Sequence, residues 1–249
     1  MQVTWDKLLE RIQEHPLEHL GGYSPRLLYQ YFAGYSQALA VHNKPEIEEE
    51  WSLYRFNRWF VSNAYAGQQG WASYCRLLTE TDEKALDLFF EFLRIAKASD
   101  WKEEDSSKWS APDGSTTLLD LIQSETFKTK PALYFGNSGW LSGLWAMWNG
   151  YVWAERDIGV TSSKDSEVFE GFGTWLRERY KFAQDANFGK LFEFLALDHQ
   201  LTALENFFDH LDLYLAGGTS DAHTPRFRSF LDDAIADALK HQAESSSSD

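Results

Sequence analysis

The sequence predicts an all-α fold made of two tandem units of four to five helices each, related by an internal duplication and followed by a C-terminal helix. Three observations lead to this prediction. Apolar residues recur at the three- and four-residue spacing of a helix face, no useful stretch alternates like a β-strand, and a set of aromatic landmarks occurs twice in the same order. With 249 residues, 43% of them apolar, the chain can bury a substantial core.

Internal similarity is clearest in the motif A-L-[DE]-x-F-F-[DE]-x-L, which spans 85–93 and recurs 118 positions later at 203–211. Three upstream landmarks keep the same order. The Gly-Tyr pair at 34–35 recurs at 150–151, Phe56 and Trp59 match Phe172 and Trp175, all at an offset of 116, and Pro16 matches Pro131 at 115. A drift of a few positions is expected when two copies diverge in their loops.

These landmarks divide the chain into a first helical unit at 1–98, a linker at 99–116, a second helical unit at 117–216, and a C-terminal helix with a polar tail at 217–249. The linker is polar and rich in turn residues apart from Trp101 and Trp109, which we expect to dock on one of the units. Gly217 stops a helix, and Pro225 begins another that runs to about Gln242.

Each unit has recognisable helix signals in order along the chain. Ser24 and Pro25 are typical of an N-cap and a first helical position, and the helix that follows ends near 43–45. The next helix opens with the acidic run 46–50, and a shorter one carries Trp71. Thr81 caps a fourth helix, whose apolar ridge includes Phe89. The second unit repeats the scheme with ridges that include Trp148, Phe172, Leu191 and Phe207.

The charge balance narrows the classes of partner. With 38 acidic and 23 basic side chains the net charge is −15, which repels phosphate backbones and anionic lipid surfaces. Direct binding to nucleic acid or to a membrane is therefore not expected. No apolar run reaches the roughly 18–20 residues of a membrane span, the N-terminus lacks a secretory pattern, and the single cysteine agrees with a reducing compartment. These features predict a cytoplasmic protein.

The histidines do not form a typical metal site. His15 and His19 are four residues apart, which would place them on the same face of a continuous helix. Pro16 is expected to end the preceding helix between them, so the spacing no longer predicts a shared face. The remaining histidines, His42, His199, His210, His223 and His241, are scattered, so surface or capping roles are favoured.

Nucleophile and nucleotide motifs are weak as well. Gly136-Asn137-Ser138-Gly139 lacks the G-x-S-x-G spacing, and its asparagine and serine are more typical of a turn and an N-cap. Cys75 lies on an apolar helix, where a buried and inert thiol is favoured over a nucleophile. The sequence therefore predicts no catalytic, cofactor-binding or metal site.

Two acidic clusters remain as candidates. One comprises Glu46, Glu48, Glu49 and Glu50, next to Trp51, and the other comprises Asp165, Glu167 and Glu170. Carboxylates at a helix start compensate the helix dipole, which needs no partner. Alternatively, these residues form an acidic surface that captures Lys and Arg side chains of a basic protein, with an aromatic anchor beside it.

The second unit also resembles a group of small bacterial helical proteins of single-unit length. The resemblance lies in Pro131, Tyr134, Gly136 and Ser138, followed by the Gly-Tyr helix, the Trp175 helix and the Phe-Phe helix. Ser138 lies one position closer to the glycine than in the P-x-x-Y-x-G-x-x-S pattern of that group. In the first unit Pro16 and the glycines at 21–22 persist, but His19 replaces the tyrosine.

Proteins of that group look like the immunity proteins encoded beside bacterial polymorphic or contact-dependent toxins, many of which are nucleases. The resemblance implies a cytoplasmic inhibitor that binds a basic toxin domain and is not an enzyme. A small-molecule hydrolase or metal enzyme at the junction of the two units, and a helical scaffold without a toxin partner, are the alternatives.

Overall fold

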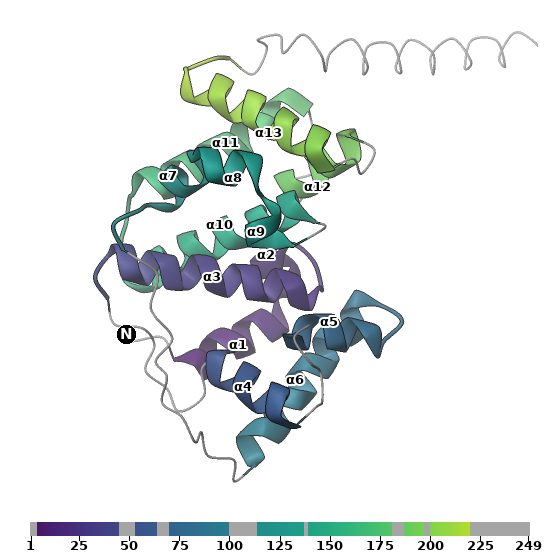
Figure 1. The fold of residues 1–249 in the computed structure, drawn as a ribbon. Coiled ribbons are helices and arrows are strands. Elements are labelled where there is room, and N and C mark those ends of the chain that lie inside the picture. The colour runs from purple at the N-terminus through teal and green to yellow at the C-terminus, as the bar shows by residue number, and fades with distance from the viewer. Residues whose placement is uncertain are drawn as a thin grey trace, which may run out of the picture.

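The fold is all-α, as the sequence predicts. A computed structural model describes residues 4–44, 53–63, 70–99, 114–136, 139–180, 187–196 and 200–219, and these ranges contain thirteen helices and no strand. Figure 1 shows two groups of helices, one from the earlier and one from the later part of the chain. Within the described ranges, no helix is both long enough and apolar enough to cross a membrane.

The earlier group consists of α1 (Trp5–Glu14), α2 (Pro16–Leu20), α3 (Pro25–Val41), α4 (Leu53–Asn63), α5 (Gly70–Leu77) and α6 (Asp82–Ala98). The later group consists of α7 (Leu118–Gln123), α8 (Glu125–Thr129), α9 (Ala132–Phe135), α10 (Trp140–Asp157), α11 (Lys164–Tyr180), α12 (Phe188–Leu195) and α13 (Gln200–Leu215). Both groups exceed the predicted four to five helices, because breaks at Pro16 and Ser124 divide the segments ahead of the long helices into short pieces.

Side-chain caps determine where several of these helices begin. Ser24 accepts a hydrogen bond from the backbone N–H of Arg26, and Pro25 occupies the first turn of α3. Thr81 accepts one from Lys84 at the start of α6. Both caps confirm the sequence prediction.

The two groups meet along α3 and α10, which lie side by side through the middle of the molecule (Figure 1). Glycines allow this close approach. A Cβ atom at Gly34 would lie 1.7 Å from the carbonyl oxygen of Met147, and one at Gly150 would lie 2.1 Å from that of Tyr31. No side chain fits at either distance, so the repeated Gly-Tyr pairs mark the place where the two helices with the most extensive contact in the described residues cross.

Aromatic rings fill the core of each group. Phe56 packs edge-on against Phe89 with ring centroids 5.1 Å apart, and in the later group Phe172 packs edge-on against Phe207 at 5.8 Å. All four side chains are completely buried. Edge-to-face packing of this kind adds to the free energy of burying the rings, so these clusters stabilise the scaffold that carries the surface.

Several predicted segments lie outside the described residues. They are the acidic run 46–50, most of the linker at 99–116 with Trp101 and Trp109, the cap at Asn137 and Ser138, and the C-terminal helix to Gln242. Those predictions stay predictions.

Candidate functional site

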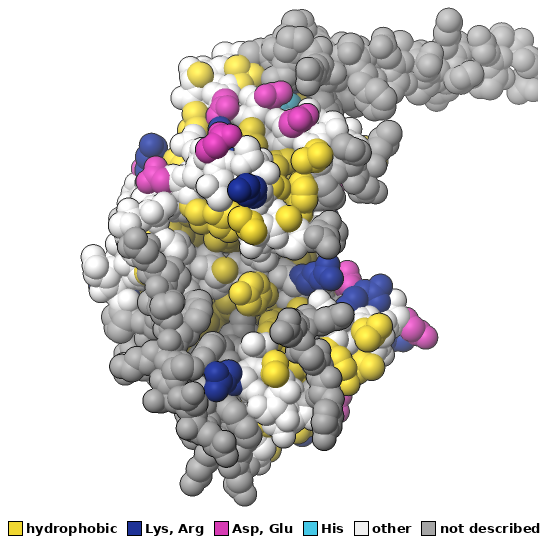
Figure 2. Space-filling view, in the orientation of Figure 1, with side chains coloured by type: hydrophobic (Ala, Val, Ile, Leu, Met, Phe, Trp, Pro, Cys, Tyr) yellow, Lys and Arg dark blue, Asp and Glu magenta, His cyan; other side chains and the backbone are white. Residues whose placement is uncertain are grey.

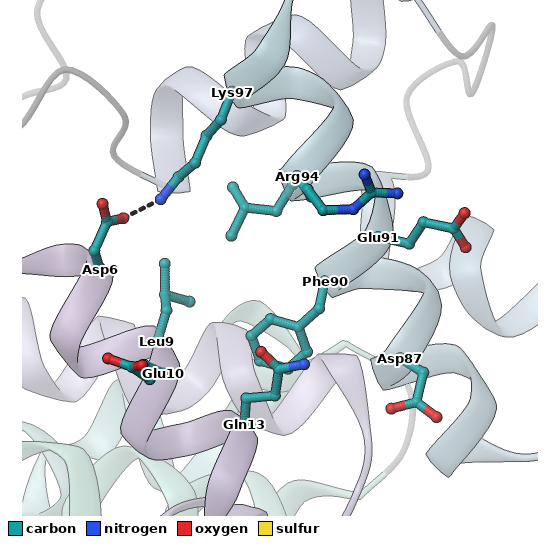
Figure 3. A pocket seen from close by; sticks show the side chains of 10 residues that line it. Asp6, Leu9, Glu10, Gln13, Asp87, Phe90, Glu91, Arg94 and Lys97 are labelled. Atoms are coloured by element: carbon teal, nitrogen blue, oxygen red, sulfur yellow. Dashed lines mark hydrogen bonds and ion pairs between the residues drawn. The ribbon is translucent and has the colours of Figure 1, made fainter.

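A groove of about 630 Å³ opens at the surface between α1 and α6 (Figure 3). The helices that form it are amphipathic. Helix α1 buries Leu8 and Ile12, and α6 buries Leu86 and Phe89, on the faces that point into the core. The polar lining of the groove comes from their outer faces, and the buried side chains of Leu9 and Leu93 lie at its floor. The same periodicity that builds the core therefore also positions this surface.

The lining combines an apolar floor with charged edges. Leu9, Phe90 and Leu93 supply the apolar surface. At one end, the Lys97 ammonium of α6 is bound to the Asp6 carboxylate of α1, which links the two helices across the groove (Figure 3). Away from that ion pair, the Phe90 side chain reaches from α6 toward α1 (Figure 3).

Carboxylates dominate the charge of this groove. Its lining holds four acidic and two basic side chains. Glu10 on α1 and Asp87 and Glu91 on α6 are exposed, and none of the three forms an ion pair within the described part of the chain. Of the two basic side chains, Lys97 is paired with Asp6, so in the lining these three carboxylates are opposed only by Arg94. The groove therefore presents apolar surface beside a net negative charge, a combination that suits a basic partner.

The sequence alone predicts no role for the groove residues, although Asp87 and Glu91 belong to the repeated motif. Their counterparts in the second occurrence of the motif, Glu205 and Asp209, are also acidic and exposed. Figure 2 shows acidic side chains on the surface of the later group of helices, around α8 and α13. Two acidic positions one turn apart, present in both occurrences beside core positions, are the signal that could have identified this face.

The acidic residues predicted to bind a partner are not gathered at this groove. The predicted cluster of Glu46, Glu48, Glu49, Glu50 and Trp51 lies outside the described residues. The other cluster, Asp165, Glu167 and Glu170, lies in the first two turns of α11.

Asp165 is buried and bonded to the protein backbone, so it does not belong to the acidic surface. It is 3% exposed, and its Oδ1 accepts a hydrogen bond from the backbone N–H of Leu119 at 2.6 Å. Burial raises the pKa of this carboxyl group above its ordinary value, although the Leu119 N–H opposes the shift. The carboxylate thus points into the molecule and supports the start of α7.

Glu167 and Glu170 are exposed on α11. Glu167 accepts a hydrogen bond from the Ser162 hydroxyl, and Glu170 forms an ion pair with Arg156 at 2.6 Å. An acidic surface at this helix start is therefore limited to these two side chains, each with a partner inside the protein.

The histidines are separated from one another. His15 is exposed between α1 and α2, whereas His19 is 1% exposed, its Nδ1 lies 3.2 Å from the Tyr31 hydroxyl, and burial lowers its pKa to about 4. In the described residues, no three His, Cys, Asp or Glu side chains gather in a way that could hold a metal ion.

A capping role is confirmed for His42, the C-cap residue of α3, whose backbone N–H donates to the Ala38 carbonyl oxygen. Its side-chain Nε2 lies 2.7 Å from the Glu155 carboxylate. The surface or capping role predicted for His210 is wrong. This side chain is 1% exposed in α13, its Nε2 lies 2.6 Å from the Tyr180 hydroxyl, and burial lowers its pKa to about 4. The sequence shows only an isolated polar residue, because its aromatic neighbours come from other helices.

Polar groups also converge where the two groups of helices meet. The Arg11 guanidinium donates hydrogen bonds of 3.1 and 2.7 Å to the two oxygens of Asp157, and the Tyr35 hydroxyl donates a third of 2.9 Å. Arg11 also lies 4.8 Å from the ring centre of Trp153. These contacts join α1, α3 and α10, and both oxygens of the Asp157 carboxylate are already engaged.

Cys75 is completely buried in α5, and burial raises the pKa of its thiol to about 12. The protonated thiol is therefore the stable form at neutral pH, in agreement with the prediction of a buried cysteine.

Comparison of the chain with known proteins finds no matching protein family, no matching curated protein and no matching solved structure.

Proposed function

We propose that this chain is an immunity protein that binds a bacterial toxin in the cytoplasm and blocks it by a protein–protein contact. The observation that carries the proposal is the α1–α6 groove, with its apolar floor and its free carboxylates, on a chain of net charge −15. Such a surface accelerates association with a basic protein. Nuclease domains fit this description, because an enzyme that binds a phosphate backbone must display a basic surface.

Inhibition by binding is favoured over catalysis at the junction of the two groups. The ionisable groups that converge there, Arg11, Asp157 and Tyr35, are joined to one another. The open groove lies elsewhere, and among its described lining residues there is no serine, cysteine or histidine to serve as a nucleophile. This arrangement supports a protein-binding role without a cofactor, in preference to a hydrolase or metal enzyme.

We also propose that the two groups of helices arose by tandem duplication. Ring contacts at matched positions support this origin. Phe56 stacks on Trp59 at 6.0 Å with an interplanar angle of 28°, and Phe172 stacks on Trp175 at 6.1 Å and 18°. Adjacent phenylalanines 89–90 and 207–208 each have centroids 5.1 Å apart, at 70° and 72°.

The reciprocal contact of α3 and α10 agrees with the same origin. Gly34 faces Met147, and Gly150 faces Tyr31. Both the glycines and the residues they face are separated by the offset of 116 that relates the Gly-Tyr pairs, so the crossing is nearly symmetric. An ancestral single unit would form the same contact with a second copy of itself.

Co-expression tests the proposed function directly. The chain is produced together with the product of the neighbouring open reading frame, and growth and complex formation are measured. We expect rescue of growth and a stable co-purified complex whose association slows as salt is added. Absence of a complex at low salt, with both proteins folded, would remove the proposal.

A pair of charge-reversal variants tests whether the groove is the contact. Replacing Asp87 and Glu91 with lysine is expected to slow association several-fold while leaving the thermal melting temperature nearly unchanged, because both side chains are exposed. The control is Glu178→Lys on the exposed side of α11, together with Glu205→Lys on α13, which makes the same change in net charge elsewhere. Equal slowing in both variants would assign the effect to net charge alone.

A further inference from the structure

We propose that Phe90 in the α1–α6 groove receives a lysine or arginine side chain of the basic protein partner, which lies over the aromatic ring beside the carboxylates of Asp87 and Glu91. This inference rests on the proposed function and names the chemistry of one contact within it. Three observations carry it: the position of the ring, the free carboxylates around it, and an internal counterpart in the later group of helices.

The Phe90 ring is held in place and remains accessible. It packs edge-on against Phe89, with centroids 5.1 Å apart, and it is only partly buried. Figure 3 shows it reaching across the groove beside Gln13 of α1, with Asp87 and Glu91 on the α6 side. A ring with an accessible face and flanking carboxylates attracts a cation through both the ring quadrupole and the negative charge.

The counterpart in the later group already holds a cation. Phe208 occupies the position of Phe90 in the repeated motif, and the Nζ atom of Lys128 lies 4.9 Å from the centre of its ring. Lys128 is 115 positions after Gln13, the offset that also relates Pro16 to Pro131. The chain therefore supplies its own ammonium group to the later ring, and a neutral amide stands at the matching position beside the earlier one.

The acidic neighbours are common to both places. Asp87 lies three positions before Phe90 and Glu91 directly follows it. Glu205 and Asp209 occupy the same two positions relative to Phe208. Phe208 is 8% exposed beneath its lysine and Phe127, whereas Phe90 is more exposed. The earlier site thus has the ring and the carboxylates of the later one, but Gln13 stands where the later site has the lysine that lies over the ring. The occupant we assign to the earlier ring is therefore a basic side chain from another protein and not an apolar or acidic one.

A short basic peptide tests this contact without the toxin. Acetylated tetralysine amide is titrated into the full chain, and the ring resonances of ¹³C-labelled phenylalanine are followed by NMR, with acetylated tetraglutamine amide as the neutral control. We expect saturable shifts of the Phe90 resonances with tetralysine only. Changing Asp87 to Asn and Glu91 to Gln should weaken binding several-fold, whereas the matched changes Glu205→Gln and Asp209→Asn should leave it unchanged, because Lys128 already occupies that ring.

A second test introduces beside Phe90 the lysine that the later group of helices has at the matched position, Lys128. Gln13→Lys places an internal ammonium group near Phe90 and should weaken tetralysine binding by about two- to fivefold. Gln13→Met, similar in length and uncharged, should leave binding close to that of the unmodified chain. Both changes are at an exposed position, so circular dichroism should show the same helix content in each.

Tetralysine shifts that avoid Phe90, or equal affinity in the Gln13→Lys and Gln13→Met variants, would overturn the inference. This result is separable from the fate of the proposed function. If a toxin complex forms but tetralysine does not bind at the groove, the proposed function is supported and the Phe90 contact is contradicted. If tetralysine binds at Phe90 but no toxin complex forms, the contact is supported and the proposed function is contradicted.

Discussion

Replacing Gly34 by alanine should separate the two helices at the centre of the fold. The added Cβ would lie 1.7 Å from the Met147 carbonyl oxygen, and ordinary contact begins near 3.4 Å. The obstacle is backbone and not the end of a flexible side chain, so α3 and α10 must move apart by about 1.7 Å to reach ordinary contact. Gly150→Ala meets the Tyr31 carbonyl oxygen at 2.1 Å and should act in the same way.

The cost follows from the size of this displacement. Adding a methyl group to a well-packed core costs about 1–3 kcal/mol, and a clash with backbone belongs at the upper end of that range. For a chain of this length, about 3 kcal/mol lowers the melting temperature by roughly 6–12 °C. The double variant should lose less stability than the sum of the losses in the two single variants, because the first separation already makes room for the second methyl group.

The matched control is Gly173→Ala in α11. A Cβ there would have only the Arg177 guanidinium, at 3.6 Å, as a neighbour. Relief of the glycine's helix penalty should therefore stabilise the protein by roughly 0.5–1 kcal/mol. Thermal melts and urea titrations of the three single variants and the double variant measure these differences. If Gly34→Ala melts at or above the temperature of the Gly173→Ala variant, the close approach of the two helices is not present in solution.

Three further predictions concern buried polar groups. Because burial lowers the pKa of His19 and of His210 to about 4, the unfolded chain binds more protons between about pH 6.5 and 4, and stability should fall as the pH drops through that window, by up to about 3 kcal/mol for each histidine. In urea titrations, the loss of unfolding free energy between pH 7 and pH 4.5 should be smaller for His210→Gln than for the unmodified chain. An equal loss in both proteins would show that a group other than His210 titrates. Asp165→Asn keeps an oxygen acceptor for the Leu119 N–H and should cost less than about 1 kcal/mol at pH 7, whereas Asp165→Ala leaves that donor without its acceptor and should cost about 1–3 kcal/mol; the reverse order in urea unfolding would contradict the described hydrogen bond. Asp157→Ala removes the acceptor shared by an arginine and a tyrosine and should cost about 2–3 kcal/mol, against less than about 1 kcal/mol for Glu170→Ala in its exposed ion pair; equal melting temperatures for the two variants would refute this difference.

Local signals in the sequence predicted local structure well. Ser24, Pro25 and Thr81 begin α3 and α6 where their side chains suggested, because a cap depends on only three or four neighbouring residues. The repeated Gly-Tyr pairs signalled a special position, although the sequence did not show that the two glycines face each other's helices.

Features that depend on distant helices were missed. The burial of His210 arises from rings on α11 and α12, and that of Asp165 from the start of α7. The groove arises because α1 and α6 bring together carboxylates about 80 positions apart in the chain. Periodicity reports which face of a helix is apolar, but not which polar faces will meet.

The crossing of α3 and α10 also has a consequence for how the chain is made. Residue 41 leaves the ribosome long before residue 157, and at about 5–20 residues per second the interval is roughly 6–23 s. During that time the glycine-bearing side of α3 has no α10 to cover it. A nascent chain of this kind exposes a surface that holdase chaperones can bind. Synonymous codons that slow translation between the two helices prolong this exposure and should lower the yield of native protein.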